Sequence, residues 1–403
     1  MVKSSISVPR APTRYVYFVL LIAAIGGILY GADVGVISGA LLFMKNDIGL
    51  DNQQISFIGS AVLGGGAFAT LVTGPLADIF GRRAMIILSA ILFLLGVIVV
   101  VMATSYSGIL FGRLIQGIGI GIITIATPLY IAELMPSHYR GRGLATFQLM
   151  LTAGILLAGL IGIYFTNHGG NWRGMFLATL VPGVLFLLGS LFMPGSPRWL
   201  ILKGRESEAL AILKKTRHED EALLEFQEMQ MLTREHAQES HSFWQLLRLK
   251  QYWKPFALVC VIAIVQQLTA INSLLQFSAL LLKNSGLDSN IVAMMGATGM
   301  MALNFLSTIL AILLVDKLGR KFLMIVGTLG LTCALLYTAA VLHFVATSPL
   351  QGELLMLGLF GFIIFFAIGP GAVIWMIQAE PTSKMAPVSL LDSCAKKQTK
   401  GAT

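Results

Sequence analysis

The stretch Asp78-Ile-Phe-Gly-Arg-Arg83 lies between two long apolar runs, and a matching stretch, Asp316-Lys-Leu-Gly-Arg-Lys321, lies between two such runs in the second half of the chain. Both have an acidic residue, then a glycine, then two basic residues at the same spacing. A charged glycine turn that recurs at equivalent places in two halves predicts an internal repeat. In membrane proteins such repeats build two related helical bundles.

The composition indicates a membrane protein. Of the 403 residues, 56% are hydrophobic and 12% are charged, whereas about 25% of residues are charged in soluble domains. A helix needs roughly 20 apolar residues to cross a bilayer, and a β-barrel would alternate polar and apolar residues, which residues 91–102 do not. We therefore predict an all-α membrane protein. Its ten spans are expected at 15–44, 55–77, 84–104, 107–132, 143–166, 173–193, 254–282, 290–315, 322–345 and 350–379.

The basic residues predict the orientation of the chain. With the N-terminus inside, the outer loops hold only Lys45, Arg173 and Lys283, and nearly all other Lys and Arg residues fall on inner segments. This asymmetry is typical of membrane proteins, and it accounts for the net charge of +9. It predicts a multi-pass protein of the cytoplasmic (inner) membrane with both termini in the cytoplasm, in contact with the lipid bilayer.

Other function classes are less well supported. A nucleic-acid-binding protein would present a basic face with exposed aromatic residues, so no nucleic-acid partner is expected. Three scattered cysteines, Cys260, Cys333 and Cys394, suit neither a disulfide framework nor a metal site. No nucleophile–base set or phosphate-binding loop is evident, so the chain is not expected to be an enzyme or to use a cofactor.

The chain divides into four predicted parts. Residues 1–193 form a six-helix bundle, and residues 194–253 form a cytoplasmic loop with nearly balanced charges. Apolar residues at helical spacing predict amphipathic helices over Glu206–Lys215 and Glu219–Thr233. Residues 254–380 form a partial bundle of four helices, and residues 381–403 form a polar cytoplasmic tail.

Two ionisable residues lie deep within predicted spans: Asp33 in the first and Arg113 in the fourth. Charged groups at that depth cost several kcal/mol unless they pair or face water, so we expect the two to pair. The pair is either a structural ion pair or a proton-coupling pair, in which making and breaking the contact loads and releases a proton.

A second group of intramembrane residues is polar and uncharged. Amides offer both donors and acceptors, which suits a ligand rich in hydroxyl groups, and an indole face suits a sugar ring. Each residue could instead form a hydrogen bond between helices. Gln267 and Asn272 share a helix face only if the helix is broken between them. The group consists of Gln148, Gln266, Gln267, Asn272, Asn304 and Trp375.

Charged residues at the inner ends of the spans form a third group. Opposite charges at matching ends of both bundles could form ion pairs that hold an inner gate shut, or they could simply set the topology. The group consists of Asp78, Arg82, Arg83, Glu133, Arg140, Arg142, Asp316, Arg320, Lys321 and Glu380.

Taken together, these motifs resemble the sugar porter family of the major facilitator superfamily. The resemblance covers residues 15–380. Its motifs are Gly31–Gly39, Asp78–Arg83, Gly112-Arg113, Pro128–Glu133, Arg140–Gly143, Ser196–Leu200, Gln266–Asn272, Asp316–Lys321 and Gly369–Gly371.

The resemblance implies a major facilitator fold and alternating-access transport of monosaccharides, often with a proton as the coupling ion. It also implies proton coupling by Asp33 and Arg113, and sugar contacts from the six polar residues above.

The chain departs from the family pattern at several positions. Gly195 stands where the family has a glutamate, and Ala270 stands where it has a glycine. Residues 276–277 are Gln-Phe in place of a usual tyrosine pair. These changes predict a weaker inner ion pair, and altered helix breaking and outer-gate closure in the seventh span.

The second half is also shorter than the first. After Glu133 the chain builds two further spans, whereas after Glu380 it passes into a lysine-rich polar end. We therefore expect ten of the family's twelve spans, an incomplete second bundle and a truncated or frameshifted gene product. Three functions stay open at this point: a proton-coupled sugar carrier, a remnant that has lost transport, and a sugar-binding membrane sensor.

Overall fold

The computed structural model describes residues 14–238, 250–286 and 289–371. All regular secondary structure in these ranges is helical. Ten helices or helix pairs in them are long and apolar enough to cross a membrane. The predictions of an all-α membrane protein and of ten spans in this part of the chain are confirmed.

The described residues form two compact units. The first contains residues up to 36 together with 43–161 and 170–238, and the second contains 37–42, 162–169 and the described residues from 250 onward. The first unit holds most of α1 (Arg14–Ile48) and α5 (Ser137–Asn167). Its other helices are α2 (Asn52–Phe80), α3 (Arg82–Met102), α4 (Tyr106–Leu134), α6 (Trp172–Ala178), α7 (Leu180–Leu191), α8 (Pro197–Leu202), α9 (Glu206–Thr216) and α10 (Glu219–Gln238).

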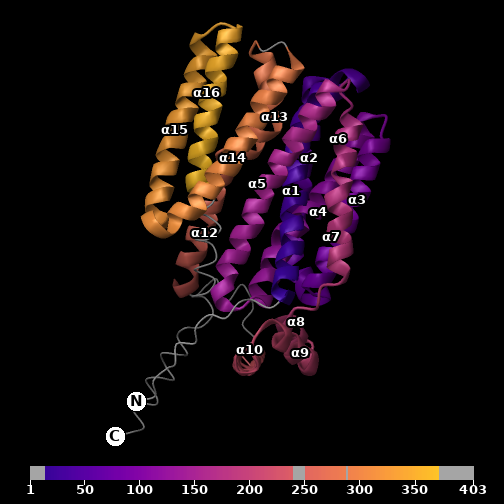
Figure 1. The fold of residues 1–403 in the computed structure, drawn as a ribbon, viewed down its shortest axis with the longest axis vertical. Helices are drawn as coiled ribbons and strands as arrows, with labels where there is room; N and C mark the ends of the chain where they lie inside the picture. The colour runs from indigo at the N-terminus through magenta and orange to yellow at the C-terminus, as the bar shows by residue number, and fades with distance from the viewer. Residues whose placement is uncertain (1–13, 239–249, 287–288, 372–403) are drawn as a thin grey trace. The chain divides into compact units, whose positions relative to one another are not determined.

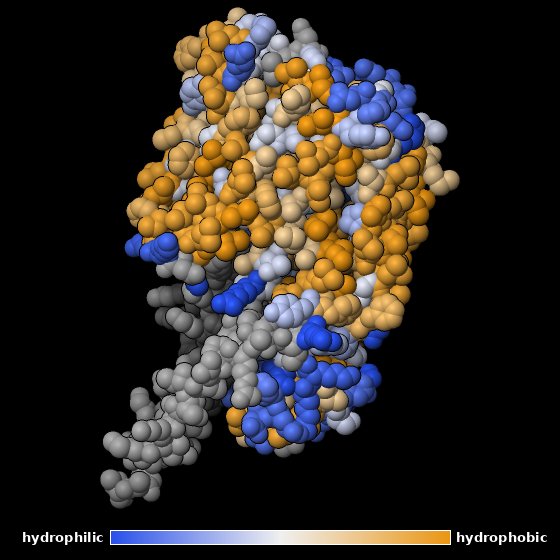
Figure 2. Space-filling model, viewed as in Figure 1, coloured by the Kyte–Doolittle hydropathy of each residue, from blue (hydrophilic) through white to orange (hydrophobic). Residues whose placement is uncertain are grey.

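The long helices of the first unit run side by side, and α8, α9 and α10 gather at one end of them (Figure 1). The amphipathic helices predicted after residue 194 thus form as α9 and α10. On the face drawn in Figure 2, mostly apolar side chains cover the long helices of the first unit, and mostly hydrophilic side chains cover α8–α10. An apolar belt above a polar cap is the distribution that a bilayer and its aqueous border require.

Helices α1 and α5 pack backbone against backbone. At Gly31 an added Cβ would lie 1.9 Å from the carbonyl oxygen of Leu151, and at Gly35 it would lie 2.7 Å from that of Ile155. Neither position therefore has room for a side chain. Close approach through glycine is a common way for membrane helices to associate, because lipid offers no hydrophobic driving force between them.

The second unit contains the remaining helices. They are α12 (Lys250–Leu268), α13 (Ile271–Asn284), α14 (Asn290–Leu318), α15 (Arg320–Phe344), α16 (Pro349–Phe366) and a π-helical turn over Ala367–Gly371. Its core includes Leu282 of α13, Met300 of α14 and Leu359 of α16. Figure 1 shows α13 to α16 as neighbouring long helices.

The internal repeat is visible in the backbone. Gly81 joins α2 to α3 with φ 89° and ψ 153°, and Gly319 joins α14 to α15 with φ 79° and ψ 152°. A positive φ is costly for any residue with a Cβ, which explains why both copies of the turn carry glycine. The two units thus contain the same helix–turn–helix element.

The sixth predicted span is confirmed, but it consists of two consecutive helices. Residues 173–193 were expected to form one helix, but α6 ends at Ala178 and α7 begins at Leu180. Pro182 has no N–H to donate to the carbonyl of Ala178, so one backbone hydrogen bond of a continuous helix is missing at this point.

Candidate functional site

The predicted charge pair forms deep in the first unit. Arg113 Nη1 on α4 donates to Asp33 Oδ1 on α1 at 2.8 Å, and the two side chains are 0% and 1% exposed. Arg113 Nη1 also donates to Gln116 Oε1 at 3.1 Å. The Phe176 ring of α6 lies 5.5 Å from the guanidinium carbon. The cation is thus held by one carboxylate, one amide and one aromatic face.

Several polar atoms of this cluster have no hydrogen-bond partner among the described residues. They are Asp33 Oδ2, Arg113 Nε and Nη2, and Gln116 Nε2. Removing two charges from water costs several kcal/mol per ion, and only good geometry with further hydrogen bonds offsets that cost. An incompletely satisfied ion pair contributes little to stability, so its presence in the core favours a functional role.

The charged turn after α2 assembles an inner cluster. Arg82 Nη1 contacts Asp78 Oδ1 at 2.9 Å, and Arg82 Nη2 contacts Glu133 Oε1 at 2.8 Å. Arg82 and Glu133 are buried, whereas Asp78 is largely exposed. The structure therefore brings together three of the predicted gating residues, from the α2–α3 turn and the end of α4.

Ser196 completes this cluster. Its hydroxyl donates to Glu133 Oε2 and also accepts the N–H of Trp199 as the N-cap of α8. A serine directly before Pro197 is a recognisable helix start. Its bond to Glu133 joins residues far apart in sequence and has no local signal.

Two further side chains fix α8 to the bundle. Trp199 Nε1 donates to the Asp78 carbonyl at 3.2 Å, and the Tyr130 hydroxyl donates to the Pro194 carbonyl at 3.1 Å. Sequence reasoning did not assign either residue to the inner cluster.

Helices α9 and α10 are joined to the bundle by a second set of charges. Glu225 on α10 accepts from Arg140 Nη2 at 2.9 Å and from Arg217 Nη2 at 2.9 Å, and Arg217 Nη1 donates to the Leu134 carbonyl at 3.1 Å. Burial lowers the pKa of Arg217 from its usual value, and the Glu225 carboxylate opposes that shift. Arg140 was predicted as a gating residue, whereas Arg217 and Glu225 were not.

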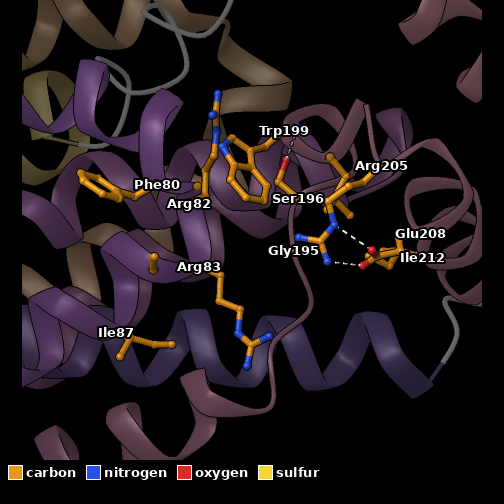
Figure 3. Close-up of a pocket in the computed structure, with 13 residues that line it drawn as sticks. Phe80, Arg82, Arg83, Ile87, Gly195, Ser196, Trp199, Arg205, Glu208 and Ile212 are labelled. Atoms are coloured by element: carbon orange, nitrogen blue, oxygen red, sulfur yellow. Dashed lines mark hydrogen bonds and ion pairs between the residues drawn. The ribbon is translucent and has the colours of Figure 1, made fainter. Parts of the chain in front are cut away.

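A cavity of about 250 Å³ opens beside the inner cluster. Figure 3 shows Trp199 among the residues that line it, together with Arg205, which is bonded to Glu208. Gly195 also lines it, and an added Cβ there would meet only Leu200, at 3.4 Å. The position therefore has room for a side chain. This cavity lies at the inner cluster, so it is distinct from the group of predicted sugar-binding residues.

In the second unit, the seventh span is broken where the polar residues gather. Helix α12 ends at Leu268, α13 begins at Ile271, and Ala270 between them has φ 61° and ψ 21°. Across the break, Asn272 Nδ2 donates to Gln267 Oε1 at 3.2 Å. The two amides thus lie on one side despite their five-residue spacing, and the helix is broken although alanine replaces the family's glycine.

The other predicted sugar contacts are placed separately. Gln266 is partly buried on α12, and Asn304 is 5% exposed on α14. Gln148 is partly buried on α5 of the first unit. Trp375 lies outside the described residues.

The remaining predicted gating residues lie at the ends of helices. Arg83 at the start of α3 donates to the Leu191 carbonyl at 2.6 Å, and Arg142 lies in the second turn of α5. Asp316 is in the last turn of α14, and Arg320 and Lys321 begin α15. Glu380 lies outside the described residues.

A further cluster lies at the opposite end of the first unit. Asp47 Oδ2 accepts from Trp172 Nε1 at 2.8 Å and from Arg173 Nη1 at 2.7 Å, and the Arg173 guanidinium carbon lies 4.2 Å from the Trp172 ring centroid. Arg173 also donates to the carbonyls of Val101 and Ala103. Sequence reasoning treated Arg173 only as a loop charge.

A helical membrane protein with a repeated charged turn, a buried charge pair and amides at a helix break has the architecture of a carrier. Comparisons with known proteins agree. The profile of the family described as "Sugar (and other) transporter" matches residues 19–386. The chain belongs to the sugar porter family of the major facilitator superfamily, and it is a transporter, not an enzyme.

Individual relatives are similar over most of their length. The glucose transporter GlcP of Staphylococcus epidermidis is 35% identical over 364 residues, which are 90% of this chain and 80% of that protein. The galactose-proton symporter of Escherichia coli is 30% identical over 373 residues, which are 92% of this chain and 79% of that protein. The partially occluded, inward-open structure of the xylose transporter XylE from E. coli is 25% identical, with a TM-score of 0.79, and covers 91% of this chain and 88% of that one.

Proposed function

We propose that this chain carries monosaccharides together with a proton by alternating access. The observation that supports the coupling is the Asp33–Arg113 pair, fully buried at 2.8 Å. A carboxylate shielded from water has few routes for proton exchange, and its charge state controls whether the arginine stays bound to it. Binding of the proton and of the sugar is then linked if both prefer the same conformation.

The sugar-binding role of the amides is part of this proposal. Gln267 and Asn272 lie together at the break in the seventh span, where amide donors and acceptors suit hydroxyl groups. Gln148, Gln266, Asn304 and Trp375 are proposed as further contacts. The names of the glucose, galactose and xylose transporters among the relatives support a monosaccharide substrate.

The inner cluster is proposed to stabilise a closed inner gate. The bonds from Glu133 and Arg82 tie the end of α4 to the α2–α3 turn, and Ser196 adds α8. Such ion pairs can break as one conformation changes into another.

The basic residues support a location in the cytoplasmic membrane with the α8–α10 end inside.

The decisive test is Asp33→Asn. The variant keeps the shape of the carboxyl group but cannot take up the coupling proton, so we expect loss of protonophore-sensitive accumulation of labelled monosaccharide while sugar exchange across the membrane persists. Uptake is measured in transporter-deficient cells after the membrane level of the chain has been quantified.

Asp47→Asn is the matched control, because it makes the same change on the same helix at its partly exposed outer end. It should retain accumulation. If the Asp33→Asn variant still accumulates sugar, proton coupling by Asp33 is contradicted. If the unmodified chain inserts well into the membrane but shows no sugar exchange, sugar transport by this protein is contradicted.

A further inference from the structure

We propose that Gln116 is a positioning residue for the coupling pair, which holds Arg113 in place when Asp33 is protonated. The inference rests on the proposed proton coupling and deepens it. Gln116 was not among the residues predicted to act in coupling.

One nitrogen of Arg113 donates hydrogen bonds to two acceptors. Gln116 lies one helical turn after Arg113 on α4, a spacing at which side chains meet. Arg113 Nη1 donates to Asp33 Oδ1 at 2.8 Å and to Gln116 Oε1 at 3.1 Å. This nitrogen carries two hydrogens, so both bonds can exist together and the second can persist when the first weakens.

Packing fixes the amide in this position. Gln116 is 0% exposed, and its Cγ lies 2.6 Å from the place where a Cβ on Gly96 of α3 would be. The absence of a side chain at Gly96 therefore provides the space that Gln116 fills. The Phe176 ring contacts the same guanidinium from α6.

Protonation changes what Arg113 is bound to. A neutral carboxyl group is a weaker acceptor than a carboxylate, and a buried cation that loses its partner carries a large desolvation cost. Arg113 Nε and Nη2 have no partner among the described residues. The Gln116 oxygen is thus the neutral acceptor that remains in place, and its presence favours the protonated state of the pair.

Among the described residues, few charged groups contact the Asp33–Arg113 pair or Gln116. Arg113 from α4 interacts with the Asp33 charge, and Asp33 in turn interacts with Tyr30 of its own helix. The groups that contact Arg113 and Gln116 from α6 and α3, Phe176 and Gly96, carry no charge. The pH dependence of coupling should therefore respond to a change at Gln116.

The experiment compares Gln116→Leu with Gln116→Glu in proteoliposomes. Proton-driven uptake of a labelled monosaccharide and sugar exchange are both measured as functions of pH. In Gln116→Leu we expect half-maximal proton-driven uptake to move toward acid by about one pH unit. At neutral pH, uptake should fall roughly tenfold while exchange changes much less.

Gln116→Glu keeps an acceptor oxygen at the same distance along the side chain. A carboxylate holds Arg113 more strongly than an amide does, so less stability is lost when Asp33 is protonated and its bond to Arg113 weakens. The pH profile of proton-driven uptake should therefore move in the alkaline direction. Thr127→Val is the control, because it removes a buried polar atom from the same helix and should leave the profile unchanged.

An unchanged profile in Gln116→Leu, or an equal loss of uptake and exchange, would overturn the inference. If Gln116→Leu does not fold, an unmoved profile in Gln116→Glu would do so instead. The proposed proton coupling is tested separately. If the Asp33→Asn variant still accumulates sugar, proton coupling by Asp33 is contradicted. If the Asp33→Asn variant is uncoupled while the Gln116→Leu variant behaves like the unmodified chain, only the role of Gln116 is contradicted.

Discussion

Ala270 has a backbone conformation that is unusual for a residue with a Cβ. Its φ of 61° places it in the left-handed region, which costs an L-residue about 1–2 kcal/mol. The break in the seventh span persists nonetheless, with Gln267 and Asn272 bonded across it. Strain of this kind persists only where the surrounding structure determines the backbone, so the break is a property of the packing and not of residue 270 alone.

Ala270→Gly should therefore stabilise the protein by about 1 kcal/mol, because glycine adopts a positive φ without strain. Thermal unfolding in detergent measures the effect. Ala263→Gly, in the helical interior of α12, is the control and should destabilise by about 1 kcal/mol. Equal effects of the two substitutions would mean that Ala270 carries no strain.

The sequence alone identifies some residues of the candidate site but not others. Asp33 and Arg113 stand out because ionisable groups within apolar spans have few partners other than each other. Gln116 and Ser196 carry no such signal, since neutral polar side chains satisfy themselves locally in many helices. Gln116 and Ser196 matter because they bond to Arg113 and Glu133, respectively. These contacts depend on how α4 packs against its neighbours.

At the scale of elements, α8 is joined to the bundle by Ser196, Trp199 and Tyr130. Gly195, which precedes the N-cap residue of α8, has room for a side chain and lines the same cavity as Arg83. A carboxylate at this position would lie among arginines, as the family pattern implies.

Gly195→Glu should raise the melting temperature at low ionic strength, by an amount that corresponds to about 0.5–1 kcal/mol for a partly exposed ion pair. Gly195→Gln controls for the loss of glycine flexibility, which stabilises by itself. The difference between the two variants should shrink in high salt. Identical melting curves in low salt would show that no ion pair forms.

Helix positions could be predicted from apolar length and periodicity, and the family resemblance pointed to the break in the seventh span, whereas the other interruptions within spans were not predicted. The interruption at Thr179, three residues before Pro182, and the π-helical turn containing Pro370 both involve a residue that cannot donate a backbone hydrogen bond. Proline within a membrane helix is tolerated when neighbouring groups satisfy the freed carbonyl. The sequence therefore marks where a break is allowed, and tertiary packing decides whether it forms.

At the scale of the whole molecule, the charge pattern predicts which surface faces the cytoplasm. The α8–α10 segment holds many charges, and the segment between α5 and α6 holds few. Because Lys and Arg are retained on the cytoplasmic side during insertion, the two segments should lie on opposite sides of the membrane.

Two single-cysteine variants test this orientation in a background without Cys260, Cys333 and Cys394. His168→Cys and Lys215→Cys change exposed residues, one in the segment between α5 and α6 and the other in α9. A membrane-impermeant thiol reagent should label His168→Cys in intact cells and Lys215→Cys only after permeabilisation. The reverse pattern would invert the proposed topology.

The close contact between α1 and α5 has a mechanical consequence. Side chains between two helices can change rotamer when the helices shift, but at Gly31 and Gly35 the backbones are in direct contact and no side chain separates them. Asp33 lies between these two contacts, so we expect its main chain to move together with α5. Any lengthening of its contact with Arg113 therefore has to come from displacement of α4 or from rotation of the two side chains.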